Sequence, residues 1–111
     1  MAAIEWHDFE RIVLVVGTIV EVNNFPEAKK PAYQLKVDLG PEIGVKPSSA
    51  QITKLYSKEE LLGKQVICVV NFNPKKIGPF LSEVLTTGFI LEEGVVLSIP
   101  DKPVPNGTRL A

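Results

Sequence analysis

The chain has 111 residues, 45% of them hydrophobic, which is the size and composition of one folded domain and excludes a disordered chain. Its formal net charge is −1 and its isoelectric point about 5.8, which excludes attraction to nucleic acid by bulk positive charge. One cysteine excludes an intramolecular disulfide, and the apolar runs are too short to span a membrane. We therefore expect a single cytoplasmic domain over residues 1–111, without membrane insertion.

The first elements are a short helical turn and a long strand. Residues 4–11 predict the turn, with Ile4, Trp6 and Phe9 packing inward. Residues 12–22 are rich in β-branched side chains, which favours a strand. A glycine within that strand, Gly17, is typical of the place where a barrel strand bends.

The rest of the chain alternates between short strands and turn residues. Residues 57–63 predict a short helix, because Ser57 and Glu60 can form a capping box and Gly63 can end the helix. The segment between the strands predicted at 64–72 and 83–91, which carries Lys75 and Lys76, is interpreted as a loop. Further strands are predicted at residues 32–39, 43–51, 64–72, 83–91 and 95–99.

The order of these elements indicates the fold class. Three strands, a short helix and two more strands is the order of an OB-fold, a five-stranded barrel that binds oligonucleotides or oligosaccharides. We expect an all-β barrel with the helix between strands 3 and 4, and with short N- and C-terminal extensions. Propensity alone does not separate this fold from other small barrels.

Three predicted strands carry apolar side chains on both faces, at residues 12–16, 66–70 and 84–91. One face fills the barrel, and the other needs a cover, because monomers rarely expose large apolar patches. The single short helix is too small for this, so we predict a homodimer with two-fold symmetry.

Catalytic signals are weak. The only histidine, His7, has no nucleophile near it in sequence, and no nucleophile-elbow, phosphate-loop or dinucleotide-binding motif is present. One histidine and one cysteine are too few for a zinc site. We therefore expect no enzyme activity, no cofactor and no metal.

Lysines gather at Lys29–Lys30, between Lys46 and Lys54, and at Lys75–Lys76. In OB barrels, the loops at the strand ends frame the ligand face, and lysines there would bind phosphates. Ordinary solubilising surface charge is the alternative. Hydroxyl and amide side chains, which suit sugar hydroxyls and unpaired base edges, lie close to these lysines in sequence and favour RNA. They are Ser48, Ser49, Gln51, Asn71, Asn73 and Ser82.

Taken together, six segments resemble the CsaA family, a branch of the tRNA-binding domains that are also appended to some methionyl-tRNA synthetases. The segments are FPEAK (25–29), DLG (38–40), KPSSAQIT (46–53), VVNFNPKKI (69–77), SEVL (82–85) and VPNGT (104–108). Two departures stand out. Apolar residues replace the Asp and Arg of a first-strand Asp-Ile-Arg-Val-Gly motif, and Lys75–Lys76 replaces an often arginine-containing pair.

The resemblance implies an OB-fold homodimer that binds folded tRNA by shape and backbone contacts. By position, the RNA surface would include Asn71, Lys75, Lys76, Ser82 and Glu83. A second candidate segment, Ser48, Ser49 and Gln51, could instead support the dimer or a loop. CsaA proteins are also described as export-related chaperones, so binding of unfolded polypeptides is the alternative function.

Overall fold

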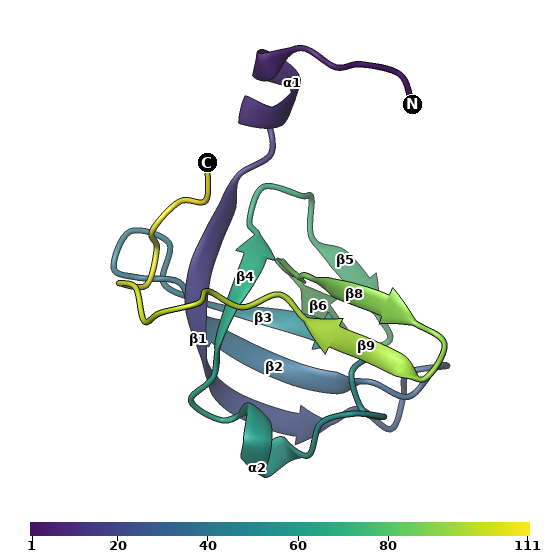
Figure 1. Ribbon diagram of the computed structural model, residues 1–111. Coiled ribbons are helices and arrows are strands. Elements are labelled where there is room, and N and C mark those ends of the chain that lie inside the picture. The colour runs from purple at the N-terminus through teal and green to yellow at the C-terminus, as the bar shows by residue number, and fades with distance from the viewer.

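The computed structural model describes residues 1–111, and its main feature is a five-stranded antiparallel sheet that curves into a nearly closed barrel of the OB type (Figure 1). The strand order in this sheet is β3-β2-β1-β4-β7, and two separate hairpins, β5–β6 and β8–β9, extend it. The elements are α1 (Trp6–Glu10), β1 (Leu14–Asn24), β2 (Tyr33–Asp38), β3 (Val45–Ala50), α2 (Lys58–Leu61), β4 (Gln65–Val69), β5 (Lys75–Ile77), β6 (Phe80–Ser82), β7 (Leu85–Thr86), β8 (Gly88–Leu91) and β9 (Gly94–Leu97).

The predicted element order is confirmed for most of the chain. The helix α2 lies between β3 and β4, as the OB-fold requires. Its capping box forms as predicted, with the Glu60 backbone N–H donating to Ser57 Oγ (3.2 Å) and the Ser57 backbone N–H donating to Glu60 Oε1 (2.9 Å). The hydrogen bond from the Ser57 backbone lowers the pKa of Glu60.

The strand β1 is the spine of the barrel, because its two halves pair with different neighbours. Residues 14–18 pair with β4, and residues 18–24 pair with β2, with a bulge between Ile19 and Glu21. The C-terminal extension continues the β2 edge alongside the first half of β1. There the Val16 N–H donates to Thr108 O (3.0 Å) and the Leu110 N–H donates to Leu14 O (2.8 Å).

The barrel interior is apolar and includes the lone cysteine. Twelve buried residues form one cluster, among which Ile19, Leu35, Leu61 and Cys68 are fully inaccessible. Burial raises the pKa of Cys68 to about 11. A protonated, enclosed thiol is a packing group and not a nucleophile.

The N-terminal turn forms, but its predicted packing is wrong. Ile4 is 72% and Trp6 is 66% exposed, and only Phe9 is half-buried. The helix α1 lies beyond the end of the barrel (Figure 1), and none of its residues is fully buried. Trp6 packs instead on Phe9, with 5.5 Å between ring centroids.

The C-terminal half departs from the prediction at two places. The single strand predicted at 83–91 is two strands, because β7 pairs with β4 whereas β8 leaves the barrel to pair with β9. The predicted loop contains the β5–β6 hairpin, whose strands have three residues each and join at Gly78–Pro79. Strands so short carry almost no periodicity, and the Gly-Pro pair was the only signal for the hairpin.

Neither of the two short helices has the length or the apolar character that a membrane-spanning helix needs.

Gly17 allows a close approach of β1 to the end of β2. A Cβ at this position would lie 2.6 Å from both Val37 Cγ1 and Leu39 Cδ2, and 2.9 Å from Asp38 O. Both side chains belong to the packed core and have little room to move.

We predict that Gly17→Ala lowers the free energy of unfolding by about 1–3 kcal/mol, because the added methyl overpacks the core. Urea denaturation measures this change. Val20→Thr, at an exposed position of the same strand, is the control and should change stability by less than about 0.5 kcal/mol. An unchanged urea midpoint for Gly17→Ala would contradict the account.

Candidate nucleic-acid interface

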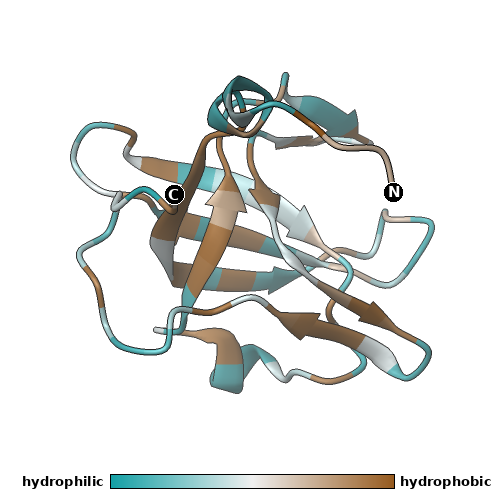
Figure 2. Cartoon of the chain, turned by 45° about the horizontal axis from the view of Figure 1, so that its top comes forward, coloured by the Kyte–Doolittle hydropathy of each residue, from teal (hydrophilic) through white to brown (hydrophobic).

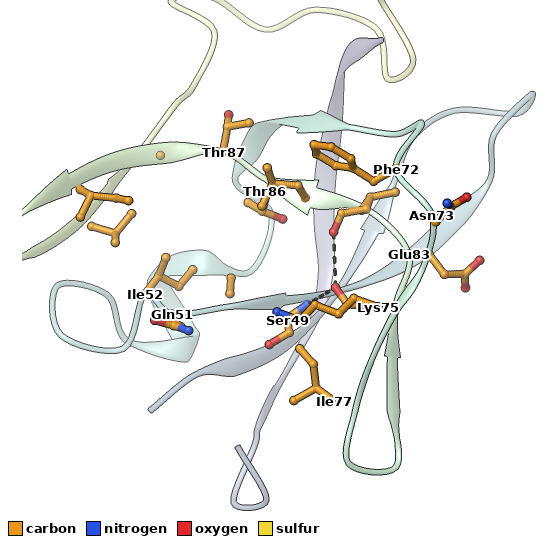
Figure 3. A pocket seen from close by; sticks show the side chains of 17 residues that line it. Ser49, Gln51, Ile52, Phe72, Asn73, Lys75, Ile77, Glu83, Thr86 and Thr87 are labelled. Atoms are coloured by element: carbon orange, nitrogen blue, oxygen red, sulfur yellow. Dashed lines mark hydrogen bonds between the residues drawn. The ribbon is translucent and has the colours of Figure 1, made fainter. Parts of the chain in front are cut away.

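An open groove of about 700 Å³ runs along the side of the barrel where β3 faces β6 and β7 (Figure 3). The loop after β4 lines one side of the groove, and the β8–β9 hairpin extends one end. Five of the predicted site residues come together here although they lie far apart in sequence. They are Ser49, Gln51, Lys75, Ser82 and Glu83.

The floor of the groove is a seam at which no strand ladder closes the barrel. Polar contacts bridge it instead. The Glu83 N–H donates to Pro47 O (2.9 Å), the Ser49 N–H donates to Ser82 Oγ (3.0 Å), and the hydroxyls of Ser48 and Thr86 share a hydrogen bond (2.9 Å). The seam is therefore held by side chains that the sequence also offers as RNA contacts.

The predicted serines consequently have different surroundings. Ser48 is fully buried and faces Thr86, outside the groove lining. Ser82 lines the groove, but its Oγ also accepts the Ser49 N–H. The side chains of Ser49 and Gln51 make no hydrogen bond within the chain and line the groove, so their polar atoms are available to a ligand.

Two pairs of lysines lie on neighbouring segments, one on the β5–β6 hairpin and one on the loop between β1 and β2. Lys75 and Lys76 follow each other on β5, so Lys75 lines the groove and Lys76 points to the other face of the hairpin. The loop between β1 and β2, which carries Lys29 and Lys30, contacts this hairpin, because Phe25 and Phe80 pack with ring centroids 5.3 Å apart. All four lysines are exposed, and none has a carboxylate within 4.0 Å.

The carboxylate of Glu83 is balanced by a nearby cation. Glu83 Oε1 lies 3.7 Å from Lys46 Nζ, and both side chains are about one-third exposed (33% and 37%). Figure 3 shows the Glu83 carboxylate pointing away from the Gln51 end of the groove. This pairing offsets negative charge that would otherwise oppose an anionic ligand near Lys75.

Asn71 directly precedes Phe72, which lines the groove, but the side chain of Asn71 itself does not line the groove. Its Oδ1 accepts the Val13 N–H (3.0 Å), and its Nδ2 donates to Arg11 O (2.7 Å). The Asn71 amide thus joins the connection between α1 and β1 to the start of the loop that follows β4. Arg109 adds a second tie, donating from Nη2 to Glu10 O (2.6 Å).

Sequence reasoning missed several residues that line the groove. Phe72 comes from the loop after β4, next to Asn73, which the sequence had indicated, whereas Thr86 ends β7 and Thr87 follows it. The signal for Phe72 was its place between Asn71 and Lys75. The chain holds no group of three or more His, Cys, Asp or Glu side chains that could bind a metal. The groove offers one exposed cation, Lys75, with hydroxyls, amides, an aromatic ring and several aliphatic side chains, which are groups for non-covalent binding.

Comparisons with known proteins show the family and agree with the fold. Residues 14–109 match the model of a family described as "Putative tRNA binding domain". The crystal structure of the CsaA chaperone protein from Picrophilus torridus is 51% identical with a TM-score of 0.93, covering 98% of this chain and 100% of that one. The structure of chaperone CsaA from Bacillus anthracis is 44% identical with a TM-score of 0.92, covering 99% and 100%.

A longer curated protein is also similar. Methionine–tRNA ligase from Pyrococcus horikoshii is 40% identical over 110 residues, which are 99% of this chain and 15% of the ligase. The chain therefore spans only a small part of the length of the ligases that it matches.

The seam generates a prediction about stability. Ser48→Ala removes a buried hydroxyl and leaves Thr86 Oγ1 with only its longer contact to Cys68 Sγ (3.7 Å), so we expect a loss of about 1 kcal/mol in the free energy of unfolding. Ser49→Ala, the adjacent control, removes a hydroxyl without a partner and should cost less than about 0.5 kcal/mol. Urea denaturation of both variants tests this, and equal losses would contradict the assignment of Ser48 to the seam.

Proposed function

Because the chain belongs to the CsaA branch of the tRNA-binding domain family, we propose that it is a non-catalytic cytoplasmic tRNA-binding protein that acts as a homodimer. Its groove face recognises folded tRNA by shape and by contacts to the sugar–phosphate backbone. The observation that carries this proposal is the set of exposed, unpaired lysines on the β5–β6 hairpin and on the β1–β2 loop that contacts it.

Exposed lysines gathered in one region would let a chain with a negative net charge bind RNA. The formal net charge is −1, so long-range attraction is weak, and binding depends on lysines that meet phosphates directly. Lys75 and Lys76 would do so from β5, and Lys29 and Lys30 from the neighbouring loop. Each lysine that neutralises a phosphate releases counterions, which makes the affinity depend on salt.

The remaining predicted site residues take two roles in this proposal. Ser49 and Gln51 have free polar atoms in the groove and would contact ribose hydroxyls or base edges. Ser48, Ser82 and Asn71 use their polar atoms within the chain, so they would hold the binding surface in shape. Glu83 would accept hydrogen bonds from base amino groups while Lys46 balances its charge.

An exposed apolar surface supports the homodimer. The β8–β9 hairpin has three exposed apolar side chains that do not line the groove. They are Phe89, Leu91 and Val96, which are 63%, 47% and 38% exposed. Figure 2 shows the hairpin as a hydrophobic element at the edge of the molecule. Large exposed apolar patches are unusual on monomers, so a second copy is the proposed cover.

The same surface supports the second candidate function. Two solved relatives carry the name chaperone, and an exposed apolar hairpin suits binding of unfolded polypeptide. In that case, the apolar face would be free on a monomer. The two functions therefore differ in which surface is used and in whether a second copy covers the hairpin.

The RNA proposal predicts that Lys75→Ala combined with Lys76→Ala weakens binding to total tRNA. The slope of log affinity against log salt should flatten by roughly 1.5, since each lost phosphate contact removes a little under one. Filter binding at several salt concentrations measures both. Lys58→Ala with Lys102→Ala, which removes equal charge outside the groove, is the control, and an equal effect there would contradict the site.

The dimer proposal predicts that the native chain sediments at twice its mass of 12.2 kDa and that Phe89→Lys sediments near 12.2 kDa. A charge at the centre of an apolar interface would be buried without a partner, which is costly. A native monomer that keeps an unfolded client soluble, with loss of this effect in Phe89→Lys, would instead support the chaperone function. A dimer unaffected by Phe89→Lys would contradict this choice of interface.

A further inference from the structure

We propose that Phe72 stacks on an unpaired base of the bound RNA, while Lys75 binds a phosphate beside that base. This inference rests on the proposed function and deepens it. It adds a base-stacking contact to a surface otherwise described by shape and charge.

Phe72 is the one aromatic residue in the groove that is free to stack. It is 59% exposed, lines the groove and packs on no other aromatic ring. The other seven aromatic side chains pack on one another, hold backbone groups by their hydroxyls, or lie outside the groove. They are Trp6 with Phe9, Phe25 with Phe80, Tyr33 with Tyr56, and Phe89.

The two residues before Phe72 are held in place by hydrogen bonds. Its neighbour Asn71 is clamped to Arg11 O and to the Val13 N–H, and Val70 N–H donates to Val13 O (3.0 Å). An exposed ring on a held backbone loses little freedom when a ligand stacks on it. Exposure of this ring is otherwise unfavourable, because it leaves apolar surface in water.

The groups around Phe72 match a nucleotide. Lys75 lines the same groove and has no carboxylate partner, so a phosphate can approach it. Gln51 and Thr87 also line the groove, and their amide and hydroxyl can reach base edges or ribose (Figure 3). Apolar side chains such as Ile52 and Ile90 also line the groove, and together with a π face, an unpaired cation and short polar groups they suit an unpaired nucleotide.

The test compares two RNA ligands and four proteins. The ligands are total tRNA, which has unpaired bases, and a fully paired RNA duplex of similar length. The proteins are the native chain, Phe72→Ala, Phe72→Leu and Phe72→Tyr, with far-ultraviolet circular dichroism to check the fold. Leucine keeps the apolar bulk without a π face, and tyrosine keeps the ring.

We expect Phe72→Ala and Phe72→Leu to weaken tRNA binding roughly tenfold, since stacking on one base is worth about 1–3 kcal/mol. Phe72→Tyr should bind as the native chain does. The salt slope should not change, because no phosphate contact is lost, and duplex binding should not change either.

Three results would overturn the inference while leaving tRNA binding in place. They are native affinity in Phe72→Ala, native affinity in Phe72→Leu, and equal loss on tRNA and duplex. The second would indicate an apolar contact without stacking. Failure of the native chain to bind tRNA at any salt concentration would instead reject the proposed function, and the stacking contact with it.

Discussion

The structure depends on how the barrel is closed between β3 and β6–β7. A regular strand ladder is absent there, and three polar contacts replace it, from the Glu83 N–H to Pro47 O, from the Ser49 N–H to Ser82 Oγ, and between Ser48 and Thr86. A full ladder would leave two strands in register and no groove between them. The polar closure keeps the barrel together and leaves side chains of both strands open to a ligand.

This closure divides the polar side chains into two groups with different tasks. Ser48 on β3 bonds Thr86 on β7, and Ser82 on β6 accepts the Ser49 N–H of β3, so both serines hold the seam together. The side chains of Ser49, Gln51 and Lys75 keep their polar atoms free. Adjacent serines in the sequence therefore have separate roles. The proposed affinity for RNA comes from Ser49, Gln51 and Lys75 and from the neighbouring lysines. The serines that bond within the chain keep the binding surface rigid, which lowers the entropic cost of binding.

The sequence predicted the fold well, because the OB order depends on local signals such as β-branched runs, turn residues and the capping box at Ser57. It failed where long-range pairing decides the outcome. The segment 83–91 reads as one β-rich run, yet β7 stays in the barrel whereas β8 leaves it to pair with β9. The roles of Ser48 and Asn71 were equally out of reach, since their partners lie 38 residues away in Thr86 and 60 residues away in Arg11. Residue type identified polar residues of which five gather at one groove, without distinguishing contacts within the chain from side chains left open to a ligand.

Hydrogen exchange measured by mass spectrometry, with and without saturating tRNA, tests most directly whether RNA binds along this seam. We expect slower exchange in residues 49–54 and 72–87, and no change in α2 on another part of the barrel (Figure 1). Protection confined to the β8–β9 hairpin or to α2, with no change in residues 49–54 and 72–87, would contradict the account.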